Sequence, residues 1–365
     1  MEQAPASAGG GPQEFASATA RRGLRRGLGI LFAMARAMAI AALAFSRTEI
    51  GAAALQELWG RARWPPLVLA FLLMTMAFLF MALRWRALLP GPARPPVTGL
   101  TAIVCAGLLL NYALPGPMGE IGAAWFASRR YGVPIPVAIA SGVAARLVGL
   151  ASAALTAALV WGIADLPIPA ELRGLVRGAV LVLALGGALL GAVTARPEPW
   201  KRLAHRLLRP FVAAGGRVAA LATRVDGLVA HIADSLAAVA HAPPGAWLRA
   251  GAWSLASHAS VIAGMALLAY ALGARPLLAG LVFTYASSTA GTVLLFLLPG
   301  SQIGWDAMMA GLLVATAGLD LTVATAVAVL VRGHHLVVMA LGAVSLAWLL
   351  RGAGPSAPAG PGLDD

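Results

Sequence analysis

Residues 111–120 read NYALPGPMGE, and this string decides how the surrounding chain can fold. It lies between two strongly apolar stretches, yet it contains two prolines, two glycines, an asparagine and a glutamate. Proline and glycine interrupt an α-helix, so backbone N–H and C=O groups here lose their intrahelical partners. Inside a bilayer such groups are tolerated only where protein or a water-filled cavity surrounds them. The string is therefore predicted to line a cavity.

The composition of the whole chain is that of an integral membrane protein. Of 365 residues, 60% are hydrophobic and 11% are charged, and the mean hydropathy is +0.82. Several apolar runs reach the roughly 20 residues that a helix needs to cross a bilayer. The clearest runs are residues 65–83, 174–194, 247–272 and 278–298. We predict an all-α polytopic membrane protein with about 6–8 transmembrane helices.

Metal and disulfide chemistry find little support in the sequence. The single cysteine, Cys105, excludes an intrachain disulfide and a cysteine-cluster metal site. His334 and His335 are neighbours and diverge on a helix, so they are expected to pack against other helices. No cofactor and no metal ion are expected.

The net charge of +13 is a topology signal, because basic clusters lie near the ends of apolar runs. If these clusters face the cytoplasm, both termini are cytoplasmic and the chain is a multi-pass protein of the plasma or inner cell membrane. Nucleic acid is not an expected partner. The clusters are Arg21–Arg26, the trio Arg84, Arg86 and Arg94, Arg129 with Arg130, residues 196–249, and Arg351.

Shifts in composition divide the chain. Residues 1–20 and 351–365 are predicted to be disordered tails around a transmembrane domain over residues 21–350. This domain comprises a first half (21–194), a basic linker (195–246) and a second half (247–350). Apolar residues at helical spacing in the linker predict an amphipathic helix on the inner membrane surface. They are Val218, Leu221, Val225, Leu228, Ile232, Leu236 and Val239.

A second break, FLLPGSQIGWD at residues 296–306, repeats the features of the first. Pro115 precedes Arg146 by 31 residues, and Pro299 precedes Arg332 by 33. Each half thus reads as an apolar run, a Pro-Gly break, a carboxylate and a long helix with an internal arginine. From the number of spans between them, we predict that the two broken elements are re-entrant and that the two pseudo-repeats are inverted. Such an arrangement places a binding site near the membrane midplane.

The groups around the breaks suit an anion or an ion pair. A half-helix beginning near Met118 would point amide hydrogens and a positive dipole end into the cavity. Asn111 offers donors and an acceptor one turn before the break. Glu120 and Asp306 are expected in the first turn after each break. They either cap the half-helix, or titrate, or pair with a cation.

The two internal arginines need partners, because a charge at such depth costs from ~2.5 kcal/mol upward. A static ion pair with Glu120 or Asp306 and a role in holding an anionic headgroup both remain open. The residues predicted to bind substrate are Asn111, Pro115, Gly116, Gly119, Glu120, Arg146, Pro299, Gly300, Asp306 and Arg332.

Several motifs occur in an order that suggests a family: the set Asn111, Pro115, Gly116, Gly119 and Glu120; ALRWRALL at 82–89; PGSQIGWDA at 299–307; and Gly318 with Arg332. Together they resemble the transmembrane region of the lysylphosphatidylglycerol synthases, flippase-like membrane proteins that also occur as standalone chains. The resemblance runs from about residue 30 to residue 350. It implies a membrane domain that moves lipids or lipid-linked precursors between leaflets.

The chain departs from the family pattern at several charges. The family carries an arginine where Ala123 and Ala124 stand, and a Glu-Arg pair where this chain has Ala145 and Arg146. Its second motif ends in glutamate, here Asp306, and its Gly-Gly is Gly300 with Ser301. The resemblance covers the transmembrane region alone. A standalone member without the aminoacyl-transfer domain is therefore expected.

Three functions are weighed. The leading hypothesis is a translocase for anionic phospholipids or polyprenyl-phosphate lipids, which works by alternate access around the two broken helices. No ATP-binding loop, H-E-x-x-H zinc motif or Gly-x-Ser-x-Gly elbow occurs, so an enzyme is not expected. The alternatives are an accessory subunit that recruits a lipid synthase through its basic segment and, with less support, an enzyme acting on lipid phosphates.

Overall fold

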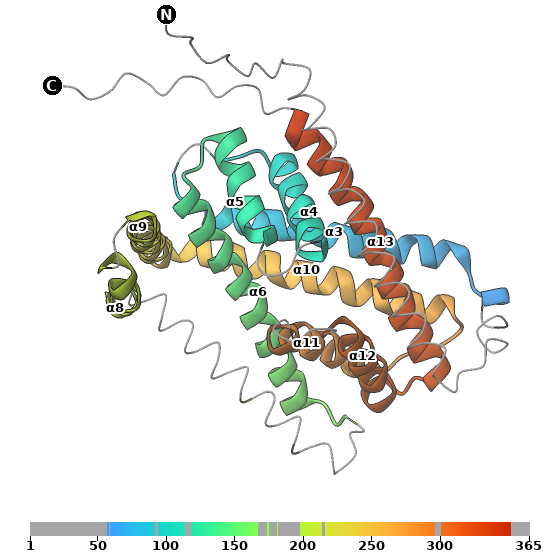
Figure 1. Cartoon of the computed structure of the whole chain (residues 1–365). Coiled ribbons are helices and arrows are strands. Elements are labelled where there is room, and N and C mark those ends of the chain that lie inside the picture. Colours follow the sequence, from blue (N-terminus) through green and yellow to red (C-terminus); the bar gives the residue numbers. More distant parts are fainter. Residues whose placement is uncertain are drawn as a thin grey trace, which may run out of the picture. The chain divides into compact units, whose positions relative to one another are not determined.

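The computed structural model describes residues 57, 59–91, 94–113, 118–166, 174, 181, 198–213, 216–295 and 301–351. Regular secondary structure in these ranges is α-helical (Figure 1). The helices are α3 (Trp64–Leu88), α4 (Val97–Ala113), α5 (Met118–Tyr131), α6 (Ile135–Ile163), α8 (Glu198–Ala213), α9 (Gly216–Ala240), α10 (Pro244–Ala271), α11 (Leu278–Leu295), α12 (Ser301–Ala317) and α13 (Leu321–Arg351).

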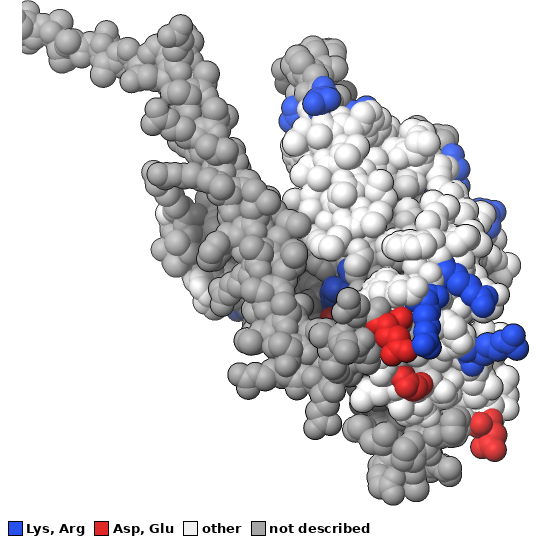
Figure 2. Space-filling view, turned by 90° about the vertical axis from the view of Figure 1, so that its right-hand side faces the viewer, with Lys and Arg blue, Asp and Glu red and all other residues white. Residues whose placement is uncertain are grey.

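Four of these helices, α3, α6, α10 and α13, are long and apolar enough to cross a membrane. Large apolar side chains on them point outward, with Leu155, Ile163 and Val344 each at least 70% exposed. Figure 2 shows a broad uncharged surface, with charged side chains at its top and right-hand margins and in a band below. Lipid tails are the solvent that suits such a surface. The prediction of a polytopic helical membrane protein is confirmed.

Helices α3 and α10 pack side by side over most of their lengths. Near one end the Arg63 amide donates to the Ala271 carbonyl at 3.0 Å, and further along the Ser257 hydroxyl donates to the Ala77 carbonyl at 3.3 Å. Between these two contacts the residue number rises on α3 and falls on α10, so the two helices are antiparallel. Small side chains at the contact let the backbones approach closely.

Helix packing follows one pattern in both halves of the molecule. The α4–α5 hairpin packs on α6 of its own half and on α13 of the other, and the α11–α12 hairpin packs on α13 and on α6. Contacts of α3 with α4 and of α10 with α11 also correspond. The packing of α3–α6 thus corresponds to that of α10–α13, and an inverted repeat stays a prediction.

Both hairpins contain short helices that cross at a glycine. Helices α4 and α5 have 17 and 14 residues, and α11 and α12 have 18 and 17. Most are shorter than the roughly 20 residues of a full span. A Cβ at Gly99 would overlap the Tyr131 ring, and one at Gly280 would overlap the Thr316 carbonyl. Glycine at these two crossings lets each hairpin close.

The linker forms two helices where a single amphipathic helix is predicted. Helix α8 packs on α9, and α9 packs on α6. Of the predicted apolar stripe, Val239 is buried, whereas Leu221 and Leu228 are exposed. Hydrogen bonds to Asp234 and Glu198 raise the pKa of the Lys201 ammonium group, and the bond to Asp234 joins α8 to α9.

Two expectations about charged residues are wrong. The predicted span ends at residue 83, but α3 continues to Leu88 and carries Arg84 into the interior, where it is 7% exposed. Arg84 is therefore not part of a cytoplasmic loop. Asp306 is the sixth residue of α12, one turn later than expected, because this helix already begins at Ser301.

Other predictions lie outside the described residues. They concern the tail at residues 1–20, the basic cluster Arg21–Arg26, the break residues Pro115, Gly116, Pro299 and Gly300, most of the run 174–194, and residues 352–365.

Glycine at the α11–α12 crossing is testable by substitution. Gly280→Ala should lower the unfolding free energy by about 1–3 kcal/mol, because its Cβ would meet backbone atoms that cannot move aside. Gly251→Ala, on α10 with open space around its Cβ, should be neutral or stabilising, since alanine favours a helix. Thermal unfolding in detergent measures both. Equal melting temperatures for the two variants would contradict the close crossing.

Candidate functional site

A hydrogen bond across the first helix break joins the Asn111 side chain before it to the Gly119 backbone amide after it. Helix α4 ends at Ala113 and α5 begins at Met118. The Gly119 amide donates to Asn111 Oδ1 at 2.7 Å, which supplies a partner to one of the unpaired amides at the start of a helix. A Cβ at Gly119 would overlap the Gly107 carbonyl and the Asn111 side chain. Asparagine and glycine at these positions therefore join the two half-helices closely.

Glu120 on α5 and Arg146 on α6 form an ion pair. Asn111 Nδ2 also donates to Glu120 Oε1 at 3.4 Å. The second carboxylate oxygen, Oε2, is buried and has no hydrogen-bond partner among the described residues. Of the alternatives left open by the sequence, pairing of Arg146 with Glu120 is confirmed. Whether this pair binds substrate stays a prediction.

Asp306 on α12 and Arg332 on α13 form the equivalent pair in the second half. Arg332 Nε donates to Asp306 Oδ2 at 3.0 Å, and Nη2 donates to Oδ1 at 2.7 Å. In both pairs the arginine follows its carboxylate by 26 residues and is the twelfth residue of its helix. This bidentate geometry is the strong form of an arginine–carboxylate contact.

A cavity of about 310 Å³ opens beside the first break, between α3, α4, α5, α6, α10 and α11. Four of the predicted site residues line it: Asn111, Gly119, Glu120 and Arg146. Asp306 and Arg332 are not among its lining residues. The structure thus brings the first-half residues together and places the second-half pair elsewhere.

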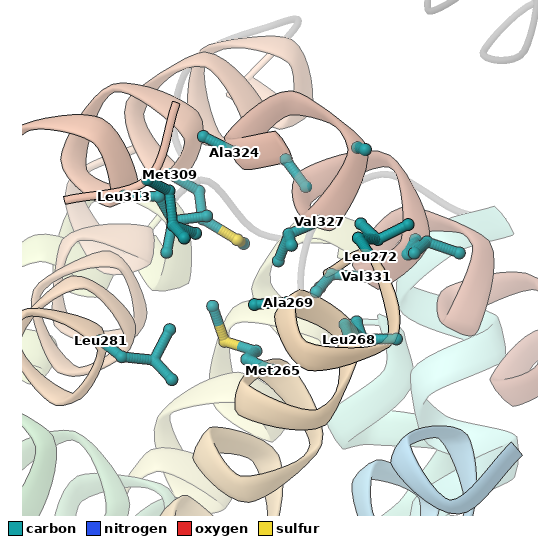
Figure 3. Packing of buried hydrophobic residues seen from close by; sticks show 14 of the residues in the cluster. Met265, Leu268, Ala269, Leu272, Leu281, Met309, Leu313, Ala324, Val327 and Val331 are labelled. Atoms are coloured by element: carbon teal, nitrogen blue, oxygen red, sulfur yellow. The ribbon is translucent and has the colours of Figure 1, made fainter. Parts of the chain in front are cut away.

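At the equivalent place in the second half, larger apolar side chains fill the interior. Glu120 and Asp306 lie 186 residues apart, as do Arg146 and Arg332. At the same separation, Ala123 corresponds to Met309 and Ala145 corresponds to Val331. The two alanines line the cavity, whereas Met309 and Val331 are buried in the apolar cluster of α10–α13 (Figure 3).

Sequence reasoning missed several polar residues that line the cavity, among them Arg84, His258 and Tyr285. The His258 ring lies 2.9 Å from the Ser152 hydroxyl and 3.1 Å from the Tyr285 hydroxyl. Ser254 and Ser257, near His258 on α10, also form hydrogen bonds to α3. Helical spacing alone could not show that His258 faces a cavity, since this depends on how α6, α10 and α11 meet.

Metal binding finds no support among the described residues, because no three His, Cys, Asp or Glu side chains converge there. His334 instead packs, with its ring stacked on Phe78 and its Nε2 3.0 Å from the Thr75 hydroxyl. The expected packing role of His334 is confirmed.

The broken helices, the paired charges and the repeated packing agree with a comparison against known families. The family model described as lysylphosphatidylglycerol synthase TM region matches residues 28–343. The chain belongs to this family. Comparison with curated proteins and with solved structures gives no match. Both hairpins and the linker of this lysylphosphatidylglycerol synthase TM region lie within the matched residues.

The ion pair of the second half predicts non-additive effects of substitution. Arg332→Gln alone should cost about 2–3 kcal/mol of unfolding free energy, because it leaves Asp306 charged and largely buried. Adding Asp306→Asn should restore part of this loss. Thermal unfolding of the two single variants and the double variant measures the coupling.

The exposed pair Glu57–Arg61 is the matched control, with side chains 63% and 80% exposed. Its coupling should be below about 0.5 kcal/mol. Equal coupling energies for the two pairs would contradict a structural role for Asp306 and Arg332.

Proposed function

We propose that this protein moves lipids with anionic headgroups, phospholipids or polyprenyl phosphates, between membrane leaflets. The observation that carries the proposal is the cavity at the first helix break. It holds an ion pair, an asparagine and a helix N-terminus inside an apolar bundle. Its volume of about 310 Å³ suits a headgroup, and the acyl chains would stay in the surrounding lipid.

Alternate access of the two halves is the proposed mechanism. The shared packing pattern and the antiparallel α3–α10 pair support two units of opposite orientation. Such units can rock against each other around a site between them. The Glu120–Arg146 pair would open toward a headgroup phosphate in one state and close in another, because arginine binds phosphate and carboxylate with the same planar fork.

The membrane and its orientation are part of the proposal. The basic clusters support cytoplasmic termini and a location in the plasma or inner membrane, following the bias of lysine and arginine toward the cytoplasmic side. We assign transport and no catalysis to the chain. A lipid is the partner that the cavity and the apolar surface favour.

The α8–α9 pair supports a second candidate, an accessory subunit that recruits a lipid synthase. Leu203, Leu207 and Phe211 are exposed on α8 beside several arginines. An amphipathic surface of this kind can bind a partner protein as well as anionic headgroups.

Transport of fluorescent lipids in proteoliposomes tests the translocase proposal. The wild-type protein should move an anionic phospholipid or a polyprenyl phosphate, and Glu120→Gln should reduce the rate at least tenfold. Loss of the carboxylate removes the ion pair of Glu120 with Arg146 at the cavity, and a tenfold lower rate corresponds to a barrier higher by about 1.4 kcal/mol.

Glu198→Gln, an exposed substitution of the same kind on α8, is the control and should transport like wild type. If the wild type moves none of these lipids, the translocase proposal fails. A phenotype that then depends on Leu207 and Arg224 would favour the accessory subunit.

A further inference from the structure

Arg84 is a buried cation that takes part in none of the ion pairs among the described residues. Its side chain lies at the cavity, and the residue is 7% exposed. Five other residues provide the cations of the ion pairs among the described residues, and Arg84 is not one of them: Arg61, Arg146, Lys201, His205 and Arg332.

The surroundings of the Arg84 guanidinium position it without neutralising it. Its Nη1 donates to the Ser254 hydroxyl at 3.4 Å, and its Nε has no hydrogen-bond partner among the described residues. A Cβ at Gly149 would overlap the guanidinium, so this glycine makes room for it. The neighbouring Trp85 donates to the Ser141 hydroxyl at 3.0 Å and joins α3 to α6. A buried charge in this state is costly unless a counter-ion arrives.

The charges around the cavity leave a positive excess. Its charged lining residues are Arg84, Glu120 and Arg146, and Glu120 pairs with Arg146. The positive charge of Arg84 therefore has no balance in the cavity wall.

The repeat shows that packing alone does not require this charge. Ala77 and Ser257, which touch at the α3–α10 contact, lie 180 residues apart. At the same separation the contact of Arg84 with Ser254 corresponds to the contact of Gly264 with Met74. At the corresponding place of the α3–α10 contact, the thioether of Met74 packs against Gly264, where Arg84 holds a guanidinium beside Ser254. The same helix crossing is thus built without a charge.

We propose that Arg84 binds the phosphate group of the ligand that occupies this cavity. Its planar donors match phosphate oxygens, and an unpaired buried guanidinium gains most from an anion. The inference rests on the proposed function, because it names the chemical group that the same site recognises. The phosphate can belong to a lipid headgroup or be free phosphate, and the experiment separates these sources.

Ligand binding to the purified protein in detergent tests this inference without any transport step. The probes are dioctanoyl phosphatidylglycerol, dioctanoylglycerol, which lacks the phosphate, and inorganic phosphate. Wild type should bind the phosphatidylglycerol at least tenfold more tightly than dioctanoylglycerol. Arg84→Gln should abolish this preference, and Arg84→Lys should retain part of it. Arg249→Gln, at an exposed arginine on α10, should bind like wild type.

Competition identifies the source of the phosphate. Displacement of the phosphatidylglycerol by millimolar inorganic phosphate would assign a site for phosphate itself, and lack of displacement would assign a site for the lipid. A melting temperature that rises more with phosphatidylglycerol than with dioctanoylglycerol in wild type, and not in Arg84→Gln, is the second expected result.

A folded Arg84→Gln variant that still prefers dioctanoyl phosphatidylglycerol over dioctanoylglycerol as strongly as wild type does would overturn the inference. If Arg84→Gln does not fold, Arg84→Lys and the wild type decide: equal binding of the two dioctanoyl lipids by the wild type overturns the inference. Failure of the proposed function looks different, since binding would still depend on Arg84 while wild-type proteoliposomes transport nothing.

Discussion

A backbone amide inside a bilayer must find a partner in the protein, and the hydrogen bond from Gly119 to Asn111 meets this requirement at the first helix break. The rest of the site depends on it. With α4 and α5 joined there, Glu120 points at Arg146 on α6, and the hairpin packs between α6 and α13. A continuous helix would satisfy the same backbone but would not turn Glu120 back toward Asn111 and Arg146.

The two halves share one packing pattern and differ in what they enclose. Both hold a carboxylate–arginine pair at the same place in the fold. In the first half Ala123 and Ala145 leave space, whereas Met309 and Val331 fill the second. These two alanines are also positions at which the family resemblance implies charged residues.

The sequence predicts the membrane spans well because length and hydropathy determine them locally. Helices α3 and α10 contain the predicted apolar runs 65–83 and 247–272 within a few residues. An ion pair with Glu120 or Asp306 is one of the two roles that the sequence leaves open for Arg146 and Arg332, because a charge at such depth needs a counter-charge. Arg84 escapes prediction, since its neighbour Arg86 and the following proline resemble a cytoplasmic helix end. Only the packing of α3 against α6 and α10 shows that it is buried.

Thiol labelling tests most directly the central claim that Ala123 lines an accessible polar cavity, whereas its counterpart Met309 is packed in an apolar cluster. In a Cys105→Ala background, Ala123→Cys and its counterpart Met309→Cys would be exposed to a small water-soluble thiol reagent in proteoliposomes. Since Ala123 lines the cavity and Met309 is 1% exposed, the account predicts rapid labelling at 123 and slow labelling at 309. Equal labelling rates at the two positions would contradict it.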